Sequence, residues 1–355
     1  MRSYRGCRSV HWGFLSAAVY FGTVLSLVAQ PSSPETPKAG DDQGVRSALS
    51  LGLKWLAGQQ ASDGSWTLAT GPNPGTATRE KVASTSLALL PFLTAGHTPQ
   101  DGQYKETLGK GLAYLTGRMK VGENGGDLRD GATMYTQALG AMVLNEACAR
   151  TKDEKLRTSG QLAVDFIVCA QNPQTGGWRY WPGTPDGDTS VTGWQFTALA
   201  MAKEANLRVP QQAFERVARH LNAVQGDDGT TYGYMMPGAG SHAMTAVGLL
   251  CRTHLGWTRE NAALRKGVEK IAGLGPLDNV YFNYYATRLL SRYGGEEWQK
   301  WRKAMHDKLL GTQDKEGPTA GSWFNEKDFW KTTLGRLGMT SLCLMTLEAG
   351  QEQPR

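Results

Sequence analysis

The sequence contains little that could cross-link it or hold a metal. It has 5 cysteines among 355 residues, and no two of them form a Cys-x-x-Cys pair. Cys7 lies near the N-terminus, and the others lie inside apolar stretches of helical character, at Cys148, Cys169, Cys251 and Cys343. We expect these four to be buried free thiols, and a single disulfide between two of them is the alternative. We predict no metal and no cofactor.

Strand patterns and basic stripes are also missing. The near absence of alternating apolar and polar residues predicts an all-α protein. The formal net charge is +6, but Arg2, Arg5 and Arg8 contribute half of it from a segment, residues 1–29, that has no acidic residue. No stripe of basic residues remains to indicate nucleic-acid binding, so nucleic acid is not a predicted partner.

The N-terminus is typical of a targeting segment. Its three arginines precede an apolar run from Trp12 to Ala29, and a Pro-rich stretch follows. A secretory signal peptide has this order, and so has an uncleaved membrane anchor. We therefore predict a signal peptide or anchor over 1–29, a spacer over 30–43 and a folded domain over 44–350. The protein is expected to be exported (periplasmic or secreted), with membrane contact only through its N-terminal segment.

A short pattern recurs along the chain: the end of a helix, a Gln, a Gly-rich turn and often a Trp. Its copies are residues 54–66, 166–178, 220–229 and 308–323, with weaker copies at 114–126 and 271–275. The helix before each turn has a charged face and should lie in water, whereas the helix after it is apolar nearly all round and should be buried. The buried helices are expected at 84–95, 132–148, 190–205, 241–254, 280–293 and 338–349.

Helix hairpins of this kind can close into a barrel or stack into an open solenoid. Solenoid repeats usually keep a fixed period, whereas Gln60, Gln171, Gln225 and Gln313 are unevenly spaced. We therefore predict an (α/α)6 toroid, a double-walled barrel of about six helix hairpins. The Gln and Trp side chains of the turns are expected to be structural, since the Gln can bond open backbone groups and the Trp can cover the junction. Sugar stacking by an exposed Trp is the alternative.

The Gln…Gly-x-Trp copies resemble the QW motifs of squalene-type cyclases and the related repeats of protein prenyltransferase β subunits. Residues 190–199 are similar to an inner-helix segment of the same cyclases. The resemblance covers residues 44–349 and implies a terpenoid cyclase-like toroid. A full squalene-type cyclase has two such barrels, and this chain has the length for one. The resemblance implies the fold but not the activity.

In such a toroid all inner helices begin at one end, which we call the mouth. Their N-termini bring partial positive charge and free backbone N–H groups there. Side chains just before each inner helix, or in its first turns, are therefore candidate ligand-binding residues. They are Asp130, Thr133, Tyr135, Trp194, Asp278, Tyr281, Asn283, Tyr284, Asp328, Lys331 and Arg336.

The string Asp186-Gly187-Asp188-Thr189-Ser190 is the main candidate for catalysis. It resembles the Asp-rich acid motif of the cyclases, with Thr189 in place of a third carboxylate. Two close carboxylates can share a proton and act as acid and base. The simpler alternative is that Asp188 or Ser190 caps the inner helix.

His242 is the third catalytic candidate, because it lies at the start of an inner helix. The prenyltransferases hold zinc near this end with an Asp, a Cys and a His. Here Asp188 and His242 could be two ligands, but Cys251 lies further down the helix, so the set is incomplete. His242 is instead a candidate base or hydrogen-bond donor, with capping or packing as the alternative.

The aromatic residues near the mouth, among them Trp194, Tyr281 and Tyr284, have several possible roles. They could stabilise a carbocation, stack on a sugar or fill the barrel. Three functions therefore remain: an exported binding or scaffold toroid with its site at the mouth, an isoprenoid cyclase- or prenyltransferase-like enzyme, and an (α/α)6 carbohydrate-active hydrolase or lyase. The predicted partner is an isoprenoid, a sugar or a protein, and the oligomeric state stays open.

Overall fold

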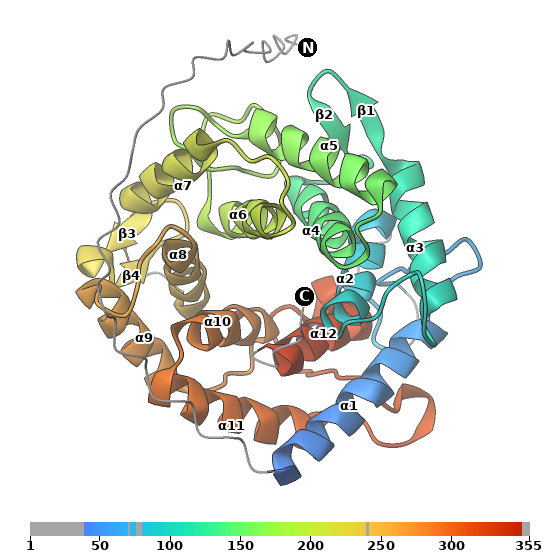
Figure 1. Cartoon of the computed structure of the whole chain (residues 1–355). Coiled ribbons are helices and arrows are strands. Elements are labelled where there is room, and N and C mark those ends of the chain that lie inside the picture. The colour runs from blue at the N-terminus through green and yellow to red at the C-terminus, as the bar shows by residue number, and fades with distance from the viewer. Residues whose placement is uncertain (1–38, 70–71, 76–79, 239–240, 350–355) are drawn as a thin grey trace, which may run out of the picture.

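The computed structural model of the chain describes residues 39–69, 72–75, 80–238 and 241–349. The predicted signal or anchor segment and most of the predicted spacer lie outside these residues. The described part contains twelve α-helices, which alternate along the chain between an outer and an inner wall (Figure 1). This confirms the predicted all-α class.

The two walls have the following helices. The outer wall consists of α1 (Ala39–Gly58), α3 (Lys105–Arg118), α5 (Glu154–Ala170), α7 (Gln211–Val224), α9 (Ala262–Leu274) and α11 (Gly295–Thr312). The inner wall consists of α2 (Lys81–Thr94), α4 (Met134–Thr151), α6 (Thr189–Glu204), α8 (His242–His254), α10 (Val280–Tyr293) and α12 (Lys331–Glu348).

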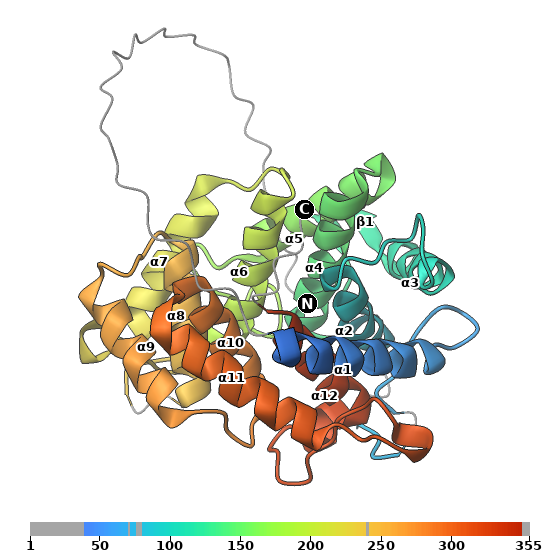
Figure 2. The same ribbon diagram turned by 60° about the horizontal axis from the view of Figure 1, so that its bottom comes forward.

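The inner helices form a closed ring. Each contacts the next in the order α2, α4, α6, α8, α10 and α12, and α12 contacts α2. They are apolar on nearly every side because they pack on two neighbours and on the outer wall; in α2 all residues from Val82 to Leu93 are buried. Figure 2 shows α1 lying beside α11 and α12, so the first outer helix completes the outer wall. The molecule is an (α/α)6 toroid, as predicted.

The turn that joins α5 to α6 shows how one hairpin is held to the next. The side-chain amide of Gln171 donates hydrogen bonds to the backbone oxygen of Gly176, at 2.8 Å, and to that of Ala213 in the next outer helix, at 3.0 Å. Gly176 has a positive φ of 81°, and a Cβ atom there would lie 1.9 Å from the backbone oxygen of Arg216. The turn therefore requires glycine, and the Gln joins neighbouring hairpins.

The Trp of the same turn ties the outer helix to the inner one. The Trp178 ring is buried, and its Nε1–H donates to the backbone oxygen of Ile167 at 2.8 Å. Its backbone N–H donates to Thr192 Oγ1 of α6 at 3.1 Å. Trp66 and Trp323 are buried and make the corresponding two bonds in their own turns. The three Trp rings are thus structural, as expected, and we call these three segments the Gln–Trp turns.

In each Gln–Trp turn the Gln side chain donates a hydrogen bond to a neighbouring outer helix, and one of these bonds closes the barrel. Gln60 donates to Thr107 of the next outer helix, α3, as Gln171 does to Ala213 of α7. Gln313, in the last turn, donates to the backbone oxygen of Ala48 in α1, at 2.9 Å. The last hairpin therefore holds the first in the way that earlier hairpins hold their successors.

Some details differ from the expectation. Helix α1 already begins at Ala39, inside the predicted spacer, and α12 begins at Lys331 because its first residues continue across a kink at Gly335, where φ is 56°. Two short antiparallel hairpins, β1 (Lys120–Gly122) with β2 (Gly125–Asp127) and β3 (Gln225–Gly226) with β4 (Thr231–Tyr232), stand in turns. The described residues also contain two short 3₁₀ turns: η1 (Asp227–Gly229) lies between β3 and β4, and η2 (Gly317–Thr319) lies between α11 and α12.

The four cysteines of the described residues are free, and three of them are buried; Cys169 is half-buried. None of the helices in the described ranges combines the length and the apolar character needed to span a membrane.

Candidate functional site

Arg179 organises the mouth. It lies in the loop between Trp178 and α6, and its Nη1 atom is 3.0 Å from Asp186 Oδ2. Its Nε atom is 3.2 Å from Asp188 Oδ2, an ion pair without hydrogen-bond alignment. The guanidinium also lies over the rings of Tyr180 and Tyr234, 5.1 and 5.8 Å from their centres. One cation thus holds two carboxylates and two aromatic rings in place.

Asp188 is fully buried and caps α6. Its Oδ1 atom accepts the backbone N–H of Val191 at 2.8 Å, so the N-cap interpretation describes its position. Burial raises the pKa of Asp188 from 3.8 to about 6, and the bond from Val191 and the charge of Arg179 oppose this rise. The Arg179 guanidinium pairs with both Asp186 and Asp188, so one cation neutralises both carboxylates. The acid-pair hypothesis for Asp186 and Asp188 stays a prediction.

A chain of hydroxyl groups crosses the mouth beside Asp188. Tyr135 Oη of α4 lies 2.8 Å from Ser190 Oγ of α6, which lies 3.2 Å from Tyr281 Oη of α10. Tyr180 and Tyr234 join their hydroxyls at 2.7 Å, which links the loops before α6 and α8. Burial raises the pKa of Tyr135 and of Tyr281, so both hydroxyls stay protonated. The mouth is therefore one connected structure contributed by several hairpins.

The aromatic residues beneath this chain fill the barrel. Trp194 stacks on Tyr284 with ring centres 5.6 Å apart and an interplanar angle of 14°, and Tyr285 meets the Trp194 ring edge-on at 5.4 Å. The Trp330 ring lies 5.5 Å from the ring of Tyr281. Trp194, Tyr281, Tyr284 and Tyr285 are all buried. Of the three roles considered, these contacts favour packing of the barrel axis.

Above this packed layer, large apolar side chains are exposed on the loops before α6, α8 and α12. Phe329 is 77% exposed, Met236 is 70% exposed and Trp181 is 49% exposed. Tyr234 and Met235 are also exposed, and the Met235 sulfur lies 3.0 Å from Arg179. We call Trp181, Tyr234, Met235, Met236 and Phe329 the rim.

Other predicted residues have local structural roles. Asp130 pairs with Arg118 at 3.0 Å, and Lys331 donates to the backbone oxygen of Glu326. Thr133 occupies the N-cap position of α4 but makes no side-chain cap bond.

Arg336 does not belong to the mouth cluster. It is buried and donates to Asp314 at 2.6 Å, to Ser322 at 3.0 Å and to Asn73 at 3.0 Å. Its guanidinium also lies over the Phe324 ring. The prediction of Arg336 as a ligand-binding residue is at odds with this position, because the kink at the start of α12 directs it between two loops of the wall.

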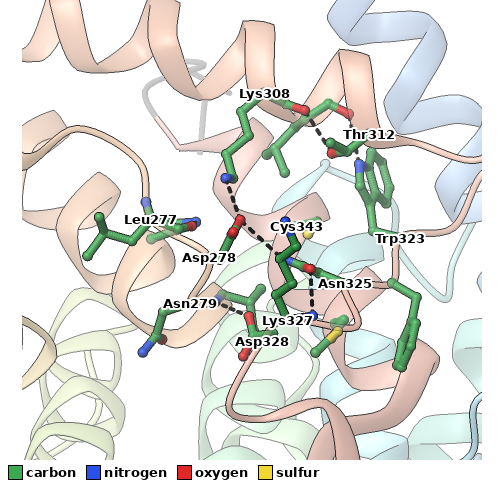
Figure 3. A pocket seen from close by; sticks show the side chains of 15 residues that line it. Leu277, Asp278, Asn279, Lys308, Thr312, Trp323, Asn325, Lys327, Asp328 and Cys343 are labelled. Atoms are coloured by element: carbon green, nitrogen blue, oxygen red, sulfur yellow. Dashed lines mark hydrogen bonds and ion pairs between the residues drawn. The ribbon is translucent and has the colours of Figure 1, made fainter.

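Asp278, Asn283 and Asp328 do not belong to the mouth cluster. They line a pocket in the wall of the toroid (Figure 3). The pocket has a volume of about 250 Å³ and lies between α10, α11 and α12. Asp278 binds Lys308 at 3.0 Å and accepts from Asn325. Asn283 bonds both backbone groups of Leu277, and Asp328 accepts two backbone N–H groups, at 2.6 and 2.8 Å. The polar atoms of this pocket therefore largely satisfy one another.

His242 lies at the first position of α8, exposed, beside a second pocket of about 490 Å³ that Lys270 and Asp227 also line. Its ring meets Phe282 edge-on at 6.3 Å. Within the described residues no three His, Cys, Asp or Glu side chains gather as a metal site would require.

Sequence reasoning missed the residues that organise the mouth: Arg179, Tyr180 and Tyr234, with Trp181 and Phe329 on the rim. All five lie in loops before inner helices, where the candidate rule already directed attention. All but Phe329 lie several residues before the helix starts, and the runs Arg179-Tyr180-Trp181 and Tyr234-Met235-Met236 are the signal that the sequence offers for them.

Comparisons with protein families and with curated proteins find no match. Among solved structures, a type II terpene cyclase from Scytonema matches with a TM-score of 0.61 and 12% identity, over 88% of this chain and 98% of that chain. Cellobiose 2-epimerase from Bacillus thermoamylovorans matches with 0.62 and 13%, over 86% and 98%. An inactive variant of an α-1,6-mannanase from Salegentibacter matches with 0.61 and 10%, over 86% and 98%. These proteins share the (α/α)6 toroid with this chain, and identities this low establish the fold alone.

Proposed function

We propose that this chain is a binding protein whose mouth binds an apolar segment of a protein or peptide partner. The rim supports this proposal most directly, because five large apolar side chains stay exposed on three loops before inner helices, and two of them, Tyr234 and Met235, contact Arg179. Exposed apolar side chains that gather in one place mark interaction surfaces on soluble proteins. Met235 and Met236 favour a peptide over a sugar, since flexible thioethers adapt to side chains of different shape.

The candidate carboxylates Asp188, Asp130 and Asp328 are less suited to catalysis. Asp188 is buried and bound to Arg179 and to the N-terminus of α6. Asp130 is paired with Arg118, and Asp328 is saturated by backbone N–H groups. A general acid or base must reach the reacting atom of its substrate, whereas these groups are committed to the protein. The packed rings of Trp194 and Tyr284 occupy the axis that an enclosed isoprenoid would need.

A peptide library displayed on phage tests the proposal. We expect selected peptides to carry aromatic or aliphatic anchors and to lose at least tenfold in affinity for a variant with Trp181, Met236 and Phe329 changed to Ser. A control with Leu51, Val121 and Leu274 changed to Ser removes exposed apolar residues elsewhere and should bind normally. Equal losses in both variants, or no peptide selected at all, would contradict the proposal.

The second candidate is an acid–base enzyme, and the raised pKa of Asp188 is the observation that favours it. The Salegentibacter mannanase was made inactive by changing two neighbouring aspartates to asparagine, and Asp186 and Asp188 are two close carboxylates here. Incubation with α-1,6-mannotriose, cellobiose and geranylgeranyl dihydroxybenzoate tests this candidate. Turnover that disappears in Asp188→Asn would establish it and replace the binding proposal.

We also propose export, because residues 1–29 have the basic and apolar order of a signal peptide and a Pro-rich stretch follows. Fractionation of expressing cells, with sequencing of the mature N-terminus, tests this and distinguishes a cleaved signal from an anchor. Recovery of the full-length chain from the cytoplasm would contradict it.

A further inference from the structure

A cavity of about 230 Å³ lies at the end of the toroid opposite the mouth. The inner helices α2 and α12 end there, and α1 lies across them. Leu49, Leu53 and Ala95 give the cavity apolar walls, and Arg46, His97 and Glu348 are among its polar residues. Small-molecule pockets usually measure about 300–1,000 Å³, so a ligand of this cavity must be small.

Glu348 is the unusual residue of this cavity. Its side chain is buried, and within the described residues its Oε1 atom has no hydrogen-bond partner. Its Oε2 atom is in hydrogen-bond contact with the Thr94 hydroxyl, which also lies 2.9 Å from the backbone oxygen of Leu90. A hydroxyl has one proton and can donate to one of these acceptors. A proton on Glu348 satisfies the other contact, which agrees with burial raising its pKa well above the usual value.

The charges around Glu348 favour a cationic group beside it. The C-terminal ends of α2 and α12 carry partial negative charge. Arg150 is the nearby cation, but it is paired with Glu146 at 2.8 Å. Burial, with the charge of Arg150, lowers the pKa of His97, so His97 is neutral near pH 7. The cavity thus offers an open carboxyl oxygen in a field that favours positive charge, together with an exposed guanidinium on Arg46.

We propose that this cavity binds a small zwitterion of the apolar α-amino acid type. The ammonium group lies against Glu348, the carboxylate binds Arg46, and the apolar side chain packs on Leu49 and Leu53. The ammonium stabilises the ionised form of Glu348, so binding releases the Glu348 proton to solvent. This site is separate from the mouth and does not depend on the function proposed for it.

Calorimetry with L-leucine, L-methionine and L-valine tests the proposal, beside two half-molecules. We expect at least one amino acid to bind. Two compounds that each lack one charge of leucine should bind at least tenfold more weakly: 3-methylbutylamine, which has no carboxylate, and 4-methylpentanoate, which has no ammonium group. Titrations in buffers of different ionisation enthalpy should show release of about one proton near pH 7. No binding by any of the three amino acids, or equal binding of 4-methylpentanoate and leucine, would overturn it.

Two variants separate the two charges. Glu348→Gln keeps the size and the hydrogen-bonding of the side chain but cannot ionise, so it should lose proton release and at least tenfold in affinity. Arg46→Met should weaken leucine but not 3-methylbutylamine. Lys54→Met, which removes an exposed charge elsewhere on α1, is the control and should bind as the unchanged protein does. Normal leucine binding by folded Glu348→Gln, judged by an unchanged melting temperature, would refute the site.

Discussion

Two neighbouring segments of the third hairpin differ in almost every respect. In the turn over residues 171–178, the side-chain NH2 group of Gln171 and both Trp178 N–H groups have partners, and the Trp178 ring is buried. In the loop over 179–188, Trp181 is exposed and Arg179 pairs imperfectly with a buried carboxylate. Two tryptophans three positions apart therefore serve different purposes. The comparison teaches that the toroid keeps the residues that hold its wall and the exposed residues of the rim in adjacent, separable stretches.

Removing the buried ring should have the largest effect on stability. We expect Trp178→Ala to lower the free energy of unfolding by roughly 3–5 kcal/mol, because it leaves a cavity and frees the backbone oxygen of Ile167. Chemical denaturation monitored by circular dichroism measures this. A loss below about 1 kcal/mol would show that the turn is not what holds the hairpin.

Breaking the closing bond should have the next largest effect. Gln313 is buried, so Gln313→Ala removes two hydrogen bonds: the backbone oxygen of Gly321 loses its side-chain donor in a site that water does not reach, and that of Ala48 keeps only its bond within α1. We expect a loss of roughly 2–3 kcal/mol. Gln60 makes the matching bonds but is half-exposed, so Gln60→Ala should cost about half as much. Equal losses would mean that burial does not determine the strength of these bonds.

The mouth loop should respond to pH. The pKa of Asp188 is about 6 in the folded chain against an ordinary 3.8, so the folded state binds this proton more tightly. The stabilisation is therefore complete below about pH 4 and is lost as the pH rises to about 6. Asp188→Asn keeps the cap but not the ionisation, and should be more stable than the unchanged protein at pH 7 by roughly 2 kcal/mol.

Urea unfolding of both proteins at several pH values between 4 and 7 measures this difference. If the free energies of unfolding of the two proteins change in parallel with pH, burial does not raise the pKa of Asp188. The mouth loop would then be no more sensitive to pH than the wall.

Changing the exposed tryptophan should have the smallest effect. Trp181→Ser is expected to alter the free energy of unfolding by no more than about 0.5 kcal/mol, because the ring buries little area against the protein. Thermal unfolding beside Trp178→Ala provides the direct contrast. A large loss would place Trp181 in the wall and weaken the case for the rim.

The fold could be predicted from the sequence because its determinants are local. The Gln, Gly and Trp of each turn recur at short spacing, and the apolar residues of α10 predict a helix over 280–293, which are its observed bounds. The closure of the ring followed only from the uneven spacing of the repeats. The contact that closes it joins residues 265 positions apart, which no local pattern reveals.

The site could be predicted only in part. Asp188, Tyr135 and Tyr281 are candidates because they lie at helix starts, and in the structure Ser190 joins the hydroxyls of Tyr135 and Tyr281. The position of Arg179 between the carboxylates could not be predicted, since it depends on how a loop folds back over α6. Arg336 was placed wrongly for a similar reason: the kink at Gly335 changes the direction of the chain just before it, and helix periodicity does not report such a kink.

The bond from Gln313 to Ala48 makes the contact between the last and first hairpins equivalent to the contacts between successive hairpins. Because the last hairpin holds the first as the others hold their successors, a circularly permuted chain can be designed. A linker would join the C-terminal end of α12 to the N-terminal end of α1, and new termini would open at the exposed residues 258–260 between α8 and α9. Such a chain would keep every contact between neighbouring hairpins, and its refolding would show whether any hairpin has to form first.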